Sequence, residues 1–266
     1  MNERLNHVLR TGCAVLGLLS ASAQAAPEYE TPPADGREVS RRVEAVDTSR
    51  DRRQVITILV ERDGKTLKRV LESDSKRYDG VRKDLMRFQA PTDVRGVKYL
   101  TFNYEDPARH DDMWVFMPAN NLLRRISGNG MRGVFMRSDL YNEDLRKREL
   151  DDDTHRLLRT EPCLETRCYV VERRLKDDSE SNYGRRLVWV RGDIWLPVRI
   201  EYYDKQDRLL KVDEYSGFEE IQGIWMRTRM DVTSMRRDSH TTLLFSDIRF
   251  DQGLSDDLFL QARLRR

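Results

Sequence analysis

Two short runs of His and Asp have the side-chain types that bind divalent cations. His110-Asp111-Asp112 lies in a polar stretch, and Asp151-Asp152-Asp153 is followed closely by His155. The second run lacks the Gly and the terminal Glu of a calcium-binding loop. Polar stretches between apolar segments are more typical of solvated turns and acidic connectors. We therefore predict surface turns at both positions and no metal site.

Two further stretches match catalytic or cofactor-binding motifs only in part. Ser138 lacks the Gly-x-Ser-x-Gly elbow of a hydrolase nucleophile, so Ser138-Asp139 and Asn142 are interpreted as the start of a helix. Gly128-x-Gly130-x-x-Gly133 has dinucleotide spacing, but the βαβ unit and the later acidic residue are missing. No acid–base pair and no nucleophile with its base can be assembled. The sequence predicts a binding protein that is not an enzyme and needs no cofactor.

The N-terminal segment predicts export. Arg4 and Arg10 form a basic region, residues 11–22 are small and apolar, and Ala23-Gln24-Ala25 is a signal-peptidase site. We expect residues 1–25 to be a cleaved signal peptide, residues 26–34 an extended leader and residues 35–266 a single domain. The apolar run is too short to span a bilayer. We predict a periplasmic protein of a Gram-negative envelope that does not itself span the membrane.

The charge balance limits the classes of partner. Charged residues make up 35% of the chain, yet the formal net charge is only +2. Nucleic-acid-binding domains usually carry a clear basic excess, so nucleic acid is not an expected partner. The charges are interleaved in sign and strand-like apolar patterns persist between them, which indicates a folded, very soluble chain rather than a disordered one.

Two cysteines lie outside the signal segment, at Cys163 and Cys168. In an oxidising compartment, two cysteines in strand-like surroundings indicate one disulfide bond. Pro162 before them and the four residues between them fit the tip of a hairpin that the bond closes. Free buried thiols are the alternative.

Apolar alternation predicts strands along most of the chain. Asp35 suits the N-cap of a short helix with Val39, Val43 and Val46 on one side. After it, strands are expected at residues 53–62, 66–78, 83–89, 97–104, 113–117, 122–126, 156–160, 169–175, 185–191, 198–204, 209–218, 224–233 and 241–250. Short turns such as Asp63-Gly64 favour antiparallel order. We predict a mainly β protein, with about ten to twelve strands in a single curled sheet and one or two helices.

Residues 131–145 are the most apolar stretch that does not have a strand pattern. Met136 with Leu140, and Tyr141 with Leu145, have the spacing of one helical face. A curled sheet has a concave face that either a helix or a ligand must fill. We therefore predict that these residues, called the plug segment below, form a helix over that face, and that Gly128-Asn129-Gly130 lets it move as a lid. The alternative is a helix that simply belongs to the core.

An ordered set of motifs resembles a known family. They are Phe88-Gln89-Ala90-Pro91, Val94-Arg95-Gly96 and Tyr99-Leu100; Trp114-Val115-Phe116-Met117-Pro118-Ala119 and Arg124-Arg125-Ile126; Phe135-Met136-Arg137-Ser138-Asp139-Leu140 and Tyr141-Asn142-Glu143-Asp144-Leu145; Tyr202-Tyr203-Asp204 and Leu210-Lys211; and Asp257-Leu258-Phe259. The chain resembles the LolA-like outer-membrane lipoprotein-sorting proteins, in the branch found beside RND-type exporters of the MMPL kind. The family pattern Met-Gly-Ser-Asp-Phe appears here with Arg137 for Gly and Leu140 for Phe.

The resemblance implies a fold, a ligand and a partner. The fold would be an open antiparallel half-barrel like LolA and LolB, and its hydrophobic cavity would carry lipid or lipoprotein acyl chains for outer-membrane sorting. An inner-membrane RND/MMPL-type exporter is the implied protein partner. The residues expected to line the acyl cavity and form its lid are Trp114, Phe116, Val134, Phe135, Met136, Leu140, Tyr141, Leu145, Met226 and Met230.

Two other functional classes stay open. The protein could be an accessory subunit of an exporter, with its cavity permanently filled by its own side chains. It could also be a hydrolase of envelope lipids, although no catalytic constellation supports that class. Lipid that copurifies with the protein would separate a carrier from an accessory subunit.

Overall fold

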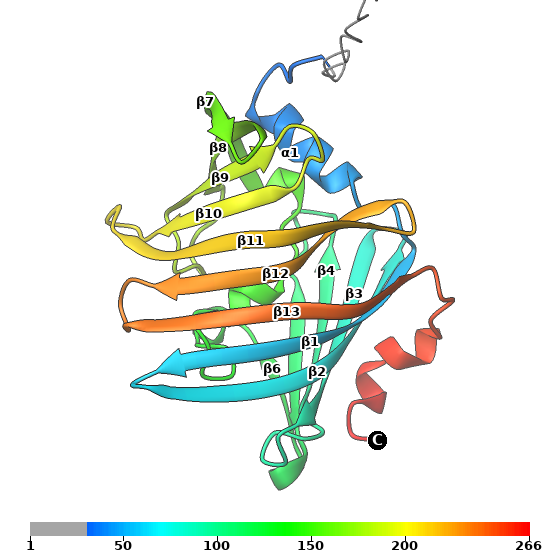
Figure 1. Cartoon of the computed structure of the whole chain (residues 1–266). Helices are drawn as coiled ribbons and strands as arrows, with labels where there is room; N and C mark the ends of the chain where they lie inside the picture. Colours follow the sequence, from blue (N-terminus) through cyan, green and yellow to red (C-terminus); the bar gives the residue numbers. More distant parts are fainter. Residues whose placement is uncertain (1–30) are drawn as a thin grey trace, which may run out of the picture. The chain divides into compact units, whose positions relative to one another are not determined.

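The computed structural model describes residues 31–266, so the predicted signal peptide and most of the predicted leader lie outside the described residues. Thirteen strands form one antiparallel sheet in the order β6-β5-β4-β3-β2-β1-β13-β12-β11-β10-β9-β8-β7 (Figure 1). Their bounds are β1 Asp51–Arg62, β2 Lys65–Tyr78, β3 Val81–Ala90, β4 Lys98–Tyr104, β5 Asp112–Met117, β6 Leu122–Ile126, β7 Asp153–Cys163, β8 Thr166–Leu175, β9 Arg185–Arg191, β10 Pro197–Tyr203, β11 Leu209–Ile221, β12 Ile224–Ser234 and β13 Ser239–Phe250. The prediction of a mainly β, single antiparallel sheet is confirmed.

Strand formation follows the alternation in the sequence. On β1, Ile56, Ile58 and Val60 are buried on one face, and the residues between them are only partly buried. Asp63 and Gly64 both have positive φ, which is the backbone of the two-residue turn that matches the twist of a hairpin. Figure 1 shows the sheet curling so that β3 and β4 lie behind β11 and β12. The face inside this curl is called the inner face below.

Helix α1, Gly36–Ala45, covers part of the inner face. The Asp35 side chain caps it by accepting a 2.8 Å hydrogen bond from the Glu38 backbone N–H. Val39 is fully buried and packs with Val43 against a cluster that contains Tyr169, Val171, Val188 and Val190. A Cβ at Gly36 would lie 2.6 Å from the Leu157 backbone N, so only glycine allows this close approach of helix and strand.

The C-terminal segment covers the opposite face of the sheet. Two 3-10 helices, Asp256–Phe259 and Gln261–Arg263, follow β13. Phe259 and Leu264 are buried against Leu85, Leu100 and Phe116 of β3, β4 and β5. Side chains therefore cover both faces of this part of the sheet.

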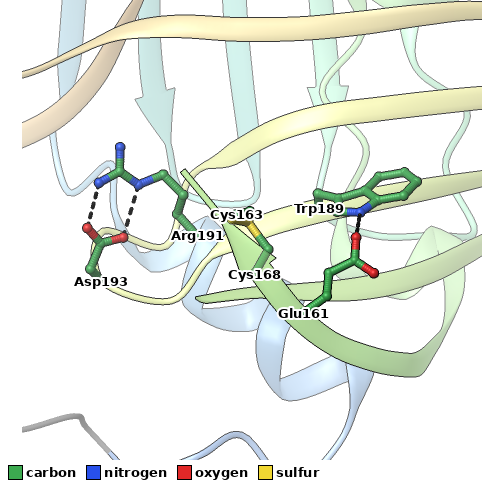
Figure 2. The surroundings of a disulfide bond; sticks show 6 residues. All are labelled: Glu161, Cys163, Cys168, Trp189, Arg191 and Asp193. Atoms are coloured by element: carbon green, nitrogen blue, oxygen red, sulfur yellow. Dashed lines mark hydrogen bonds and ion pairs between the residues drawn. A yellow bond between two sulfur atoms is a disulfide. The ribbon is translucent and has the colours of Figure 1, made fainter. Parts of the chain in front are cut away.

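The disulfide bond between Cys163 and Cys168 is present (Figure 2). It lies at the hairpin that joins β7 and β8, where Cys163 pairs with Thr166, and the two Cα atoms are 5.5 Å apart. Nearby, the Trp189 indole Nε1–H donates a 2.6 Å hydrogen bond to Glu161, which ties β9 to the same hairpin. The sequence prediction of this disulfide is confirmed.

Replacing Cys163 and Cys168 by serine should lower the free energy of unfolding by about 2 kcal/mol, because the bond closes a very short loop. For a domain of this size that corresponds to a decrease of roughly 4–8 °C in melting temperature. Thermal unfolding of the double variant measures the effect. Two free thiols in the unreduced, denatured wild-type protein would contradict the bond itself.

Candidate functional site

The connection between β6 and β7 crosses the inner face. Every pair of consecutive strands is adjacent in the sheet except β6 and β7, which lie at opposite edges. The chain that joins them includes the plug segment, residues 131–145. Met131, Phe135 and Leu140 of that segment are buried in one cluster with residues of β1–β6 and β11–β13. The plug segment therefore fills the inner face with its own side chains.

The predicted helix in the plug segment is wrong. Residues 134–141 form a tight hairpin, with an isolated bridge between Val134 and Tyr141. The Ser138 N–H donates to the Phe135 carbonyl at 2.8 Å, and Met136 and Arg137 have φ values of 47° and 61°. This left-handed backbone suits glycine, which accounts for the Gly of the family pattern at position 137. Only Asn142–Leu145 is helical, as a single 3-10 turn.

Aromatic contacts hold the tip of the plug segment in the core. The ring centroid of Phe135 lies 5.1 Å from that of Tyr99, nearly edge-on, and 6.0 Å from that of Phe88. Phe135 is 1% exposed, whereas its neighbour Val134 is 43% exposed. The hairpin therefore presents one side to the inner face and the other to solvent.

The structure divides the ten predicted cavity residues into groups. Phe135, Leu140 and Met230 lie in the main cluster, and Met136 and Leu145 pack at its margin. Of the other five, Tyr141 packs beside Tyr183 and Tyr202, and Val134 faces solvent. Met226 packs near Ile224 and Phe250. Trp114 and Phe116 lie with the C-terminal segment on the opposite face. Trp114 and Phe116 are therefore outside the site considered below.

Asp139 fixes the tip of the plug segment to β13. Its buried carboxylate accepts hydrogen bonds from the hydroxyls of Ser239 and Thr241, and its backbone N–H donates to Thr241 Oγ1 at 3.0 Å. The Ser138 hydroxyl donates to the Phe135 carbonyl at 2.6 Å, and Arg237 Nη1 donates to the Ser138 carbonyl at 3.1 Å. Ser138 and Asp139 are thus anchors of a hairpin and not the start of a helix.

Glu143 fixes the plug segment to the loop between β8 and β9. Its buried carboxylate accepts 2.6 Å and 2.8 Å hydrogen bonds from the Ser181 hydroxyl and the Asn182 backbone N–H. Arg148 Nη2 donates to the same carboxylate at 3.1 Å. The sequence analysis included Glu143 in a family motif but gave it no role, because its partners Ser181 and Asn182 are far away along the chain.

Asp144, near the end of the plug segment, binds a buried lysine. Lys211 Nζ donates to Asp144 Oδ2 at 2.9 Å and lies 3.4 Å from Asp213, so one ammonium faces two carboxylates. Tyr183 Oη donates to Asp144 Oδ1 at 2.7 Å. Lys211 Nζ also lies 4.0 Å from the ring centroid of Tyr202, within cation–π distance. This cluster is charged, buried and shared between the plug segment and the sheet.

Asp213 should destabilise the folded protein at neutral pH. Burial raises its pKa from 3.8 to about 6 against the opposing effect of Lys211, and Asp144, Tyr202 and Tyr215 also face it. A raised carboxyl pKa means that this group's contribution to stability is full below about pH 4 and is lost as the pH rises through about 6. Asp213→Asn removes the surplus negative charge and leaves the Lys211–Asp144 pair.

We expect Asp213→Asn to raise the free energy of unfolding by on the order of 3 kcal/mol at pH 8 and by about half as much at pH 5, which lies between the unfolded and folded pKa values of Asp213. Denaturant titrations at the two pH values measure the difference. Equal effects at both values would show that the carboxyl group of Asp213 does not titrate between them in the folded protein.

Three arginines surround one carboxylate next to the plug segment. Asp153 is buried and accepts a 2.9 Å hydrogen bond from Arg173 Nε and 2.7 Å and 2.9 Å contacts from Arg186 Nη2. Burial and the neighbouring Arg186 lower the pKa of Arg148 to about 10. Arg148 also binds Glu143, so this cluster connects the plug segment to β7, β8 and β9.

The two candidate metal-binding runs have structural roles. Asp111 accepts a 2.9 Å hydrogen bond from the Tyr104 backbone N–H, and burial raises the pKa of Asp111 to about 6. His155 links the Ser40 hydroxyl to the Leu150 carbonyl, and Asp151 pairs with Arg37. Within residues 31–266, no group of three His, Cys, Asp or Glu side chains is placed to hold a metal ion.

The fold of the sheet and its covering segments defines a class of protein. An open antiparallel sheet encloses an apolar inner face, and a crossing segment and one helix cover that face. Proteins of the LolA superfamily share this fold. A crystal structure of a LolA superfamily protein from Nitrosomonas europaea covers 86% of this chain and 98% of its own, at 22% identity and a TM-score of 0.69.

Closer relatives place the chain in a family. A DUF1329 family protein from Desulfovibrio piger is 40% identical, covers 86% of this chain and 97% of its own, and has a TM-score of 0.84. A putative outer membrane lipoprotein-sorting protein domain from Vibrio parahaemolyticus is 26% identical, covers 87% and 98%, and has a TM-score of 0.82. A family model described as "-like: Uncharacterized protein" matches residues 80–266. The chain belongs to the DUF1329 family, which is LolA-like. No curated protein matches it.

Proposed function

We propose that the protein is a periplasmic carrier that binds acyl chains of lipids or lipoproteins at its inner face. The observation that carries the proposal is the burial of Met131, Phe135 and Leu140 of the plug segment among apolar residues from both halves of the sheet. An acyl chain would occupy the same surface after the plug segment moves out. The similarity to a putative lipoprotein-sorting domain supports this ligand class.

The energies of the two occupants are comparable. Burying a large apolar side chain contributes about 1.5–3 kcal/mol, so the three side chains contribute on the order of 5–9 kcal/mol. A chain of ten methylenes at about 0.8 kcal/mol each contributes about 8 kcal/mol. Because these apolar terms are similar, the hydrogen bonds of Asp139, Glu143 and Asp144 decide how readily the plug segment gives way to an acyl chain. Binding without catalysis is the proposed activity.

The decisive experiment is native mass spectrometry of the protein purified from its own periplasm, together with titration by a fluorescent fatty acid. Copurified lipid and saturable displacement of the probe by unlabelled fatty acid are the expected results. A protein that carries no lipid and binds no probe would overturn the proposal.

A second candidate function is supported by the way the plug segment is anchored. Asp139, Glu143 and Asp144 each bind groups outside the segment through buried or partly buried hydrogen bonds. A permanently docked plug segment would suit an accessory subunit of an RND/MMPL-type exporter better than a carrier. Copurification with such an exporter, without lipid, would favour this alternative.

Export is part of the same proposal. No helix in residues 31–266 is both long enough and apolar enough to cross a membrane. We expect cleavage between Ala25 and Ala26, because residues 23–25 have the small-x-small pattern of a signal-peptidase site. The intact mass of the protein from the periplasmic fraction measures the cleavage. A full-length or membrane-retained chain would contradict it.

A further inference from the structure

The carboxylate of Asp144 is held by a receptor built outside the plug segment. Its two oxygens accept from different donors, Oδ1 from Tyr183 Oη at 2.7 Å and Oδ2 from Lys211 Nζ at 2.9 Å. Lys211 is 1% exposed and Tyr183 is 2% exposed. Two buried donors with this arrangement fit a carboxylate, or two oxygens of a phosphate, equally well.

The receptor remains assembled when the plug segment is disregarded. Lys211 lies on β11 and packs over the ring of Tyr202 on β10. Tyr183 is buried with Tyr202 and Leu210, and the next residue, Gly184, bonds its N–H to the Tyr203 carbonyl at 2.9 Å. A Cβ at Gly184 would lie 2.7 Å from the Asp204 carbonyl oxygen, so this backbone is packed tightly against β10. Lys211 and the backbone after Tyr183 are therefore fixed by β10 and β11, whereas the two residues before Tyr183 are also bound by Glu143 of the plug segment.

Movement of the plug segment out of the inner face removes the nearest carboxylate from a desolvated ammonium. Asp213 remains 3.4 Å from this ammonium, but the Lys211 ammonium and the Tyr183 hydroxyl each lose the hydrogen bond that they made to Asp144. A buried donor that loses its acceptor is unfavourable. A ligand that brings its own anionic group to the place of Asp144 restores the pair. To Lys211 and Tyr183 the plug segment presents the Asp144 carboxylate, and to the inner face it presents apolar side chains; these are the two parts of an anionic amphiphile.

We propose that Lys211 and Tyr183 form the recognition site for the anionic head group of the ligand, a carboxylate or phosphate on a long-chain amphiphile. The proposal rests on the proposed acyl-binding function and specifies its substrate class. Asp144 acts as the internal competitor for the site, in the same way that Phe135 and Leu140 compete for the acyl chain.

Arg69 is the natural comparison, because it is a second buried cation on the inner face. It lies on β2 opposite Ile58, and its Nε and Nη1 have no hydrogen-bond partner among the described residues. Its charged neighbours are Asp93, which attracts the guanidinium, and Arg137, which repels it. A guanidinium presents two parallel N–H donors that also fit two oxygens of one anion, so Arg69 is the rival position for the head group. Arg69→Met therefore serves as the matched control for the loss of one buried cation.

The test compares head groups on one chain length. Wild-type protein is titrated with dodecanoate, dodecyl phosphate and dodecanol by displacement of a neutral fluorescent acyl probe. We expect at least one of the two anions to bind about tenfold or more tightly than dodecanol, which corresponds to one charge-assisted hydrogen-bonded pair. Comparison of the two anions separates a carboxylate ligand from a phosphate ligand.

Single substitutions test whether Lys211 and Tyr183 cause the preference for an anionic head group. Lys211→Met should reduce the preference for the anion to less than about threefold, and Tyr183→Phe, which keeps every charge, should reduce it severalfold. Asp144→Asn should increase affinity for the anion more than affinity for dodecanol. Arg69→Met should leave the preference unchanged. Melting curves confirm that each variant is folded, and Tyr183→Phe remains informative if Lys211→Met is not.

The outcomes separate the two proposals. Equal affinity of wild-type protein for both anions and for dodecanol would overturn the head-group site but leave acyl binding intact. Loss of the preference in Arg69→Met, with the preference kept in Tyr183→Phe, would overturn the assignment to Lys211 and Tyr183. Failure of wild-type protein to bind any of the amphiphiles would overturn the acyl-binding function and the head-group site together.

Discussion

Replacing Phe135 by alanine should undock the plug segment while the sheet stays folded. Phe135 is buried between Phe88 and Tyr99, and truncating such a side chain costs about 3–5 kcal/mol. Because the plug segment competes with ligand for the inner face, weakening it should strengthen binding of a fluorescent fatty acid by at least tenfold. Hydrogen exchange should show lost protection at the Ser138 and Asn142 amides, which are bonded within the segment.

The neighbouring Val134 provides the control for Phe135. Val134 lies one residue away on the solvent side of the hairpin, so Val134→Ala should change neither exchange nor ligand affinity. If Phe135→Ala instead lowers the melting temperature of the whole domain and leaves ligand affinity unchanged, the plug segment is ordinary core and the carrier mechanism fails.

Replacing Asp153 by alanine should be among the most destabilising single changes. The variant leaves Arg173 and Arg186 buried without their shared carboxylate, and Arg148 lies beside them. Loss of one partner from a buried ion pair costs about 3–5 kcal/mol, which corresponds to a decrease of roughly 6–20 °C in melting temperature. Differential scanning calorimetry measures it.

Asp151 is the matched control for Asp153, two residues away along the chain. Its ion pair with Arg37 is 2.7 Å long, but both side chains are about half exposed. Exposed pairs contribute about 0–1 kcal/mol, so Asp151→Ala should be nearly neutral. Similar losses in both variants would mean that burial of the arginine cluster is not what makes Asp153 important.

The strands could be predicted from local sequence, because apolar residues alternate along them and short turns separate them. All thirteen strands overlap segments expected from the sequence, and Asp63-Gly64 forms the predicted turn. Antiparallel order follows from the short connections. What alternation does not reveal is which face of a strand points inward. Trp114 and Phe116 were expected in the cavity, but the C-terminal segment covers their face.

The plug segment shows where local patterns mislead. The spacing of Met136 with Leu140 and of Tyr141 with Leu145 also occurs in helices, so the sequence predicted one. The actual hairpin is stabilised by partners about 100 residues away, such as Thr241 for Asp139. The buried charges follow the same rule, because Lys211 and Asp213 alternate onto the inner face like apolar residues. Their pairing with Asp144 depends on the tertiary fold.

The pairing of β1 with β13 determines when this sheet can be completed during folding. The first and last strands lie side by side in the middle of the sheet, where Ile58 pairs with Leu243. The two halves, β1–β6 and β7–β13, are each built from neighbouring hairpins, which form quickly because their contacts are local. The central seam between them must wait until the last strand has emerged. A chain interrupted before β13 therefore keeps two half-sheets, which the plug segment tethers. The edges of β1 and β12, which pair with β13 in the complete protein, are then exposed.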